Sequence, residues 1–153
     1  MPSQIVPYLS QGGVPEEGGA VARAGFKVLV LCADEYQPSD RLFHNLDEVI
    51  HAPNDDGLGP FTKIQKVIAR LAANRVADHV RAKQHVLVTC MAGRNRSGLV
   101  TALALHKLYG WSGARCIHHV QAHRENALTN PDFVDYLKTL PVRKISSTTS
   151  SHG

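Results

Sequence analysis

The sequence predicts an α/β fold in which a mostly parallel central sheet is flanked by helices. Short runs rich in valine and leucine, with the composition of buried strands, recur along the chain. Longer segments with apolar residues at helical spacing separate them, and such an alternation is typical of α/β proteins. At 153 residues the chain is long enough for one domain, which we assign to residues 1–145, followed by a disordered tail at residues 146–153.

The first third of the chain combines an edge strand, a helix and a buried strand. We expect the edge strand at Ile5–Leu9, where a proline costs a single ladder hydrogen bond, and a turn at residues 10–13. Residues 15–24 are expected to be helical, because a proline and two glutamates suit the first turn of a helix. The apolar run at residues 26–32 is a clear strand.

A short strand, a polar loop and a long helix occupy the middle of the chain. We expect the strand at residues 49–52 and the loop at residues 53–60, which are rich in proline, glycine and aspartate. Thr62 is a good N-cap for a helix that runs to about Lys83. The apolar residues of this helix recur at helical spacing and are expected to face the core. They are Ile64, Val67, Ile68, Leu71, Val76 and Val80.

The last third begins with a buried strand and continues with three helices. The valine-rich run at residues 86–89 is the strand, and an alanine- and leucine-rich helix ends near Leu108. A second helix is expected at residues 113–123. The third spans residues 132–140, with Asn130 as its N-cap.

The loop between the central strand and its helix concentrates residues that bind anions. Cys90 and Arg96 bound it, with five residues between them. A strand that leads into a tight loop and a helix directs backbone N–H groups and the positive end of the helix to one spot, which favours an anion of phosphate size. The same field stabilises a nucleophilic Cys90 thiolate. Arg96 can hold two oxygens of a tetrahedral anion, and the Ser97 hydroxyl can reach the sulfur. The phosphate-binding residues that we assign are Met91, Ala92, Gly93, Arg94, Asn95 and Arg96.

The segment from Cys90 to Gly98, CMAGRNRSG, resembles the phosphate-binding loop of the cysteine-dependent protein tyrosine phosphatases. Its Ala-Gly pair and its Arg-Ser-Gly ending are most similar to the compact dual-specificity branch, and the resemblance covers about residues 4–140. It implies hydrolysis of phosphotyrosine, with phosphoserine and phosphothreonine as further substrates, through a phosphocysteine intermediate. The family usually has a histidine immediately before the cysteine, where this chain has Thr89.

Phosphoryl transfer to a cysteine needs a proton for the departing oxygen, and hydrolysis of the phosphocysteine needs a base. One carboxylic acid on a mobile loop can do both jobs. Asp55 and Asp56 are the paired carboxylates upstream of Cys90. In the family that this chain resembles, the acid often lies three residues after a proline. Asp56 stands in that relation to Pro53, so we favour Asp56, with Asp55 as its close competitor.

Three further features leave the substrate open. The segment from Arg124, which leads into an Asn-Pro-x-Phe pattern, also resembles the family, so Arg124 can bind a second anionic group, although a surface arginine before a capped helix fits it equally well. Arg94 is matched by a basic residue in phosphoinositide phosphatases of the same superfamily, and the pair Asn95 and Arg96 occurs in its RNA 5′-phosphatases. Thr89 keeps open a non-catalytic module that binds phosphate groups.

Composition excludes several other classes. The net charge of +4 suits phosphate-like anions but is too small to indicate nucleic-acid binding, except as an alternative substrate. Three scattered cysteines do not form a disulfide pattern and fit a reducing, cytoplasmic compartment. We expect no membrane insertion and no signal peptide. His118, His119 and His123 lack an accompanying acidic cluster, so the sequence predicts neither a metal site nor a cofactor.

Overall fold

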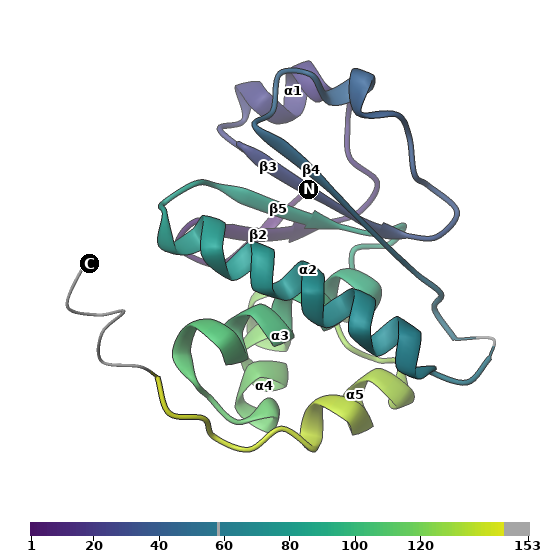
Figure 1. The fold of residues 1–153 in the computed structure, drawn as a ribbon, viewed down its shortest axis with the longest axis vertical. Helices are drawn as coiled ribbons and strands as arrows, with labels where there is room; N and C mark the ends of the chain where they lie inside the picture. The colour runs from purple at the N-terminus through teal and green to yellow at the C-terminus, as the bar shows by residue number, and fades with distance from the viewer. Residues whose placement is uncertain (58, 146–153) are drawn as a thin grey trace.

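A five-stranded sheet lies at the centre of the computed structural model, which describes residues 1–57 and 59–145 (Figure 1). Its strands are β1 (Ser3–Val6), β2 (Leu9–Gly12), β3 (Val28–Ala33), β4 (Glu48–Asn54) and β5 (Val86–Thr89). Their order across the sheet is β1-β2-β5-β3-β4. The strand β1 is antiparallel to β2, and all other neighbours are parallel. The predicted α/β fold with a mostly parallel sheet is therefore confirmed, whereas the predicted tail at residues 146–153 lies outside the described residues.

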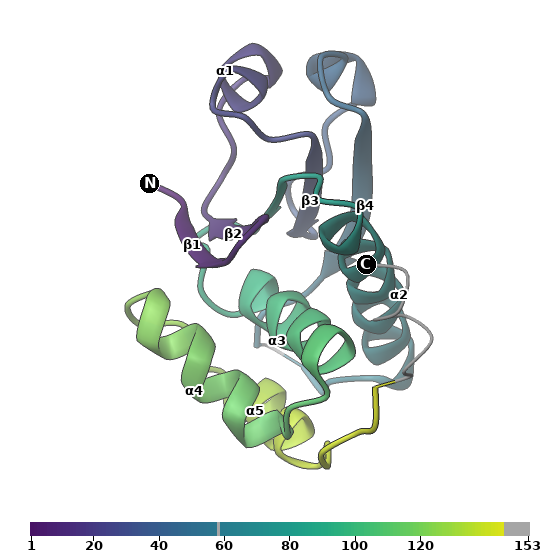
Figure 2. The ribbon, with the colours of Figure 1, turned by 90° about the vertical axis from the view of Figure 1, so that its left-hand side faces the viewer.

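Helices cover the two faces of the sheet unequally (Figure 2). One face carries α2 (Lys63–Arg81), α3 (Arg96–Tyr109), α4 (Gly113–His123) and α5 (Pro131–Lys138). The other face carries α1 (Gly18–Arg23) and the short 3-10 helix η1 (Asp40–Phe43). The larger of the two hydrophobic clusters accordingly lies on the side of α2 to α5.

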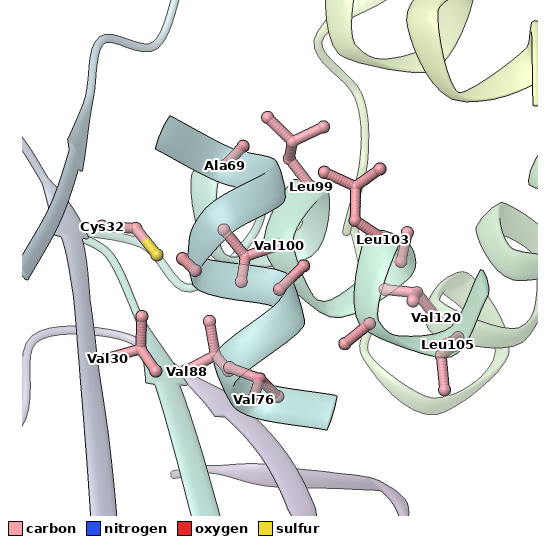
Figure 3. Close-up of a cluster of buried hydrophobic side chains, with 14 of the residues drawn as sticks. Val30, Cys32, Ala69, Val76, Val88, Leu99, Val100, Leu103, Leu105 and Val120 are labelled. Carbon is pink, nitrogen blue, oxygen red and sulfur yellow. The ribbon is translucent and has the colours of Figure 1, made fainter. Parts of the chain in front are cut away.

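The core forms where the central strands meet α2 and α3 (Figure 3). Every residue of β3 and β5 is buried, as expected for parallel strands that are covered on both faces. Val30 and Val88 project from these strands toward Val76 of α2 and Val100 of α3. This packing fixes the position of α3 relative to the carboxyl end of β5.

The predictions at the N-terminus are confirmed only in part. The edge strand of the sheet is β1, at Ser3–Val6 and not at Ile5–Leu9. Leu9–Gly12 forms β2 and not a turn, and the chain reverses instead at Pro7 and Tyr8, where Tyr8 has a φ of +71°. Because β2 pairs with both β1 and β5, even the polar Gln11 is fully buried. The strand β2 contains polar residues although it is buried, so a search for runs of apolar residues does not identify it.

The expectation for α2 is also wrong in part. Ile64 and Leu71 were expected to face the core, yet they are 72% and 58% exposed. The buried stripe of α2 instead consists of small residues, which let the helix pack closely against its neighbours. Its members are Ala69, Ala72, Ala73, Val76, Ala77 and Val80.

The carboxyl ends of β3, β4 and β5 meet at one edge of the sheet. Leu31 pairs with Thr89, and Ala33 pairs with Asn54, so the segments that follow the three strands begin side by side. In parallel sheets, ligands bind in the crevice outside the carboxyl ends of the strands. In the described part of the chain, no helix has the length and apolar character needed to span a membrane.

Candidate active site

The loop at residues 90–95 presents free backbone N–H groups. Within the described residues, none of the amides of residues 91–95 donates a hydrogen bond, whereas the Cys90 amide donates to the Gly12 carbonyl at 3.3 Å. The helix α3 begins directly after the loop, and its N-cap residue Asn95 makes no side-chain capping bond. Loop amides and the helix N-terminus together form a site for a tetrahedral anion.

The carbonyl groups of the loop are held away from that site. The Gly93 carbonyl accepts hydrogen bonds from Gln11 Nε2, at 3.0 Å, and from Arg124 Nε. The Arg94 carbonyl accepts one from the Leu128 amide at 3.2 Å. Gly93 has a φ of +68°, a conformation that a residue with a side chain adopts at a cost. These contacts turn the donors of the loop toward the anion site and its acceptors away from it.

Cys90 lies at the start of this loop. The residue is 4% exposed, and its Sγ is 3.2 Å from Ser97 Oγ. A hydroxyl at this distance can donate a hydrogen bond to a thiolate. Burial raises the pKa of Cys32 well above its usual value and that of Cys116 to about 12. Cys32 and Cys116 are therefore neutral, inert thiols at physiological pH.

The Arg96 guanidinium is hydrogen-bonded through Nη1, whereas its Nε has no partner in the described structure. Its Nη1 donates to Glu35 Oε1 at 2.5 Å and to the Asn54 carbonyl at 3.2 Å. Its Nε is buried and has no hydrogen-bond partner among the described residues. An unpaired buried donor is costly, and an anion in the loop would satisfy it.

Asn95 connects the loop to the two segments that flank it. Its Oδ1 accepts hydrogen bonds from the amides of Thr129 and Asn130, at 2.7 and 2.9 Å. Its Nδ2 donates to Asp56 Oδ2 at 3.3 Å. Asn130 Nδ2 donates to the other carboxylate oxygen of Asp56 at 2.8 Å. Asp56 is thus the carboxylate that contacts the phosphate-binding loop.

Asp55 lies in a different environment. Its backbone amide donates to Asn54 Oδ1 at 3.0 Å, and its carboxylate has no hydrogen-bond partner among the described residues. Asp55 lines a small hollow together with Gly57, Phe61 and Asn130. Both carboxylates are exposed to solvent.

The remaining residues of the predicted site take different positions. Met91, Ala92 and Arg94 are exposed on the loop. Arg124 lies behind it, where Nη1 donates to Ser3 Oγ at 3.0 Å and to the Gln11 carbonyl at 3.1 Å. Burial lowers the pKa of Arg124. Its contacts therefore support the loop, and its predicted contact with substrate stays a prediction.

Sequence reasoning missed Glu35 and Gln11. Each is distant from the loop along the chain, and each contacts it through a neighbouring strand or the end of one. The position of Glu35, two residues after the buried strand β3, was the available signal, because that strand ends at the same edge as β5. Thr89, at the position of the usual histidine, donates through Oγ1 to the Val30 carbonyl at 2.7 Å, and its side chain makes no hydrogen bond to the loop within the described residues.

Comparisons with known proteins agree with this geometry. The family model described as dual specificity phosphatase, catalytic domain, matches residues 20–141. No curated protein matches the chain. Among solved structures, human DUSP28 superposes with a TM-score of 0.73 at 23% identity, over 90% of both chains. Tk-PTP in its active form has a TM-score of 0.76 at 26% identity, over 94% of this chain and 97% of that one. PTPMT1 in complex with PI(5)P has a TM-score of 0.75 at 18% identity, over 89% and 91%.

The family match spans most of the chain and includes the loop from Cys90 to Ser97. The chain belongs to the dual specificity phosphatase family, and it is a phosphatase domain of the cysteine-dependent type.

Proposed function

We propose that this protein hydrolyses phosphate monoesters through a phosphocysteine intermediate formed on Cys90. The observation that carries the proposal is the set of unpaired donors around the sulfur. The amides of residues 91–95 and Arg96 Nε lack partners among the described residues, and the carbonyls of the same loop are bonded on the other side. Such a set of donors matches the three equatorial oxygens of a phosphoryl group during transfer.

The sequence of steps follows from these positions. The Cys90 thiolate attacks phosphorus in line with the leaving oxygen, while the loop amides and Arg96 hold the phosphoryl oxygens. A carboxylic acid of residues 55–56 gives its proton to the leaving oxygen. Water, activated by the resulting carboxylate, then attacks the phosphocysteine. The Ser97 hydroxyl at 3.2 Å stabilises the departing thiolate by donating a hydrogen bond to it.

Asp56 is our first candidate for the acid, because it is the carboxylate in contact with Asn95 of the phosphate-binding loop. Asp55 remains the second candidate, since its carboxylate is exposed and free of hydrogen bonds in the described structure. A proton donor must be able to approach the leaving group, and the glycine at position 57 gives this segment freedom to move.

We place phosphotyrosine proteins first among the substrates, with phosphoserine and phosphothreonine proteins next, as the dual-specificity family suggests. A phosphoinositide is the second candidate. Arg94 supports it, because this exposed cation inside the loop makes no ion pair in the described residues and is available to a second phosphate group. The similar structure of PTPMT1 with PI(5)P also favours testing this lipid class. RNA 5′-phosphates are a third alternative. A reducing compartment such as the cytoplasm would keep the Cys90 thiolate active.

The first experiment measures phosphate release from an aryl phosphate between about pH 5 and 8, with wild type beside Cys90→Ser. Cys116→Ser is the matched control, because Cys116 lies in α4 and its thiol donates to the Trp111 carbonyl and not to the loop. We expect Cys90→Ser to lose turnover by about 10³-fold or more while it still binds inorganic phosphate. The control should keep its activity as long as it folds.

Two outcomes would overturn the proposal. Turnover retained by Cys90→Ser would exclude the phosphocysteine intermediate. An inactive wild type that binds phosphate tightly would instead favour the non-catalytic module that Thr89 left open. Parallel assays of phosphopeptides, phosphoinositides and 5′-phosphorylated RNA then rank the substrate classes by kcat/KM.

A further inference from the structure

A groove lies between α2, α3 and α5, on the side of the molecule that is covered by the four helices. It encloses a cavity of about 340 Å³. Its apolar lining consists of Val67, Leu71, Ala73, Leu103, Tyr136 and Leu140. His106 also lines the groove, ten residues beyond Arg96 on α3, which corresponds to about 15 Å along the helix axis. A ligand in the groove therefore leaves the phosphate-binding loop accessible.

The charges that line this groove are all positive. Arg70 of α2, Lys107 of α3 and Arg143 contribute cationic side chains, and no aspartate or glutamate lines the groove. None of these three residues forms a salt bridge in the described structure. A concave surface lined by charges of one sign attracts partners of the opposite sign and aligns them.

An exposed apolar stripe on α2 continues from the groove. Ile64, Val67 and Leu71 follow one another at helical spacing and share one face of α2. Leu71 is 58% exposed and Ile64 is 72% exposed, although both are large aliphatic residues on a helix whose opposite face is well packed. Exposed apolar surface that is rimmed by polar groups is characteristic of interaction sites.

We propose that this groove binds an acidic segment of a partner protein. Large aliphatic side chains of the segment would contact the floor at Leu71 and Leu103, and its carboxylates would pair with the rim. The three cations come from different parts of the chain and line the groove together with its apolar residues, so they match several separated carboxylates better than one compact anion. A second copy of this chain, with its net charge of +4, offers a poorer electrostatic match.

A fluorescein-labelled peptide of alternating glutamate pairs and leucines is the probe. Its binding to the full chain is followed by fluorescence anisotropy, beside one peptide with glutamine for glutamate and another with serine for leucine. We expect saturable binding of the acidic peptide that weakens with salt, and weak binding of both altered peptides. At constant ionic strength, saturating inorganic phosphate should leave the binding unchanged, because phosphate occupies a different site.

Variants of the protein locate the peptide. The double variant Arg70→Glu/Lys107→Glu should weaken binding about tenfold or more. Arg23→Glu/Lys27→Glu changes the net charge equally at exposed positions on the α1 side of the molecule, and it should bind within about twofold of wild type. Leu71→Ser should weaken binding while it preserves the salt dependence. Thermal unfolding of each variant verifies that it folds.

Several results would overturn the proposal. Equal losses in the two double variants would show non-specific attraction, and equal binding of the glutamine peptide would remove the role of charge. Displacement by phosphate would place the peptide at the Cys90 loop. Binding to phosphatidylglycerol vesicles without binding to the peptide would identify a membrane surface instead. Self-association that Leu71→Ser abolishes would identify a second copy of the chain. Each readout is independent of turnover, so this proposal can fail while the phosphatase proposal stands.

Discussion

The two halves of the candidate active site are held in very different ways. The loop that follows β5 is fixed by the buried Gln11 and Ser97 and by the half-buried Arg124, and its backbone donors are left free of partners in the described structure. The segment at residues 55–57 is exposed, and the side-chain amides of Asn95 and Asn130 hold it at Asp56. In the proposed mechanism, the donors that bind the phosphoryl group thus need no reorganisation, whereas the exposed segment that delivers the proton is held by two side-chain amides and can move with the substrate when they release it.

A methyl group at Gly93 should displace the phosphate-binding loop, which is the rigid half of the candidate site. Gly93 has a φ of +68°, and a Cβ there would lie 2.6 Å from the Gly12 carbonyl oxygen, so Gly93→Ala must shift the loop. We expect kcat/KM to fall by about 10²-fold or more, because several loop amides leave their positions together. Steady-state assays with an aryl phosphate measure this loss.

Gly59→Ala is the matched control in the movable half. Its chain neighbours aside, no atom of the described residues lies within 4 Å of a Cβ built at Gly59, and this glycine does not have a positive φ. Its activity should stay within about twofold of wild type. Similar losses in the two variants would contradict the division of the site into a rigid half and a movable half.

The acid loop can be tested by removing each carboxylate in turn. Replacement of the general acid should lower kcat by about 10²-fold or more. It should also abolish the fall in rate at high pH, because that fall reports ionisation of the acid. We expect this behaviour for Asp56→Asn and a smaller, pH-independent loss for Asp55→Asn. The pH dependence of kcat for the two variants measures both effects, and the reverse pattern would assign the acid to Asp55.

Only one part of the rigid half could be predicted from the sequence, namely the part whose residues are contiguous in the chain. A valine-rich strand, a glycine-containing loop and a helix are contiguous, so their geometry follows from about twenty residues. Gln11 and Glu35 were missed, because they lie 82 and 61 positions from the residues that they contact. The only signal was the place of Glu35, two residues after the buried strand β3. The hairpin of β1 and β2 was missed for a related reason. Gln11 is polar yet buried, because its side-chain amide donates a hydrogen bond to the Gly93 carbonyl of the loop. A pattern of apolar residues cannot identify a strand that contains such a residue.

The movable half was predicted differently. The proline, glycine and aspartate content of residues 53–60 indicated a loop, and Asp55 and Asp56 were its two possible acids. Composition alone could not distinguish them, since both are exposed and adjacent. The resemblance to the family favoured Asp56 through its spacing from Pro53. The contacts of Asn95 and Asn130 with Asp56 support this choice, which stays a prediction. The α2 helix shows the same limit, because helical spacing identified apolar residues without showing which stripe packs inward.

Removal of Glu35 should weaken the rigid half without breaking it. Glu35→Ala leaves Arg96 Nη1 with the Asn54 carbonyl as its partner in the described structure, so the guanidinium loses part of its orientation. We expect kcat/KM to fall about tenfold, mainly through KM, and inorganic phosphate to bind correspondingly more weakly. Glu35→Gln should recover part of the loss, because its amide oxygen still accepts a hydrogen bond. Inhibition by phosphate gives the affinity independently of turnover.

Asp34→Asn is the matched control for this change. Asp34 is exposed and precedes Glu35, and its side chain makes no hydrogen bond in the described structure. Like Glu35→Ala, the Asp34→Asn variant removes one negative charge from this segment, and its kcat/KM should stay within about twofold of wild type. Tighter phosphate binding in Glu35→Ala would contradict the positioning role, since it would mean that the carboxylate acts mainly by repelling the anion.

The smallest expected effect concerns Asn130, which connects the movable half of the site to the helix α5. Its Oδ1 caps α5 by accepting hydrogen bonds from the amides of Asp132 and Phe133, while its Nδ2 holds Asp56. Asn130→Ala removes both contacts, and loss of the cap should lower the free energy of unfolding by about 1 kcal/mol. Asn130→Ser keeps a capping oxygen but is too short to reach Asp56, so its stability should lie within a few tenths of a kcal/mol of wild type. Both variants should lower kcat by about two- to fivefold, because the acid loop loses one of its two amide contacts.

Denaturant unfolding and kcat, measured on the same samples, separate the two roles of Asn130. If Asn130→Ser recovers kcat together with stability, the amide contact does not position Asp56, and the acid loop depends on Asn95 or on the substrate itself for its closed form.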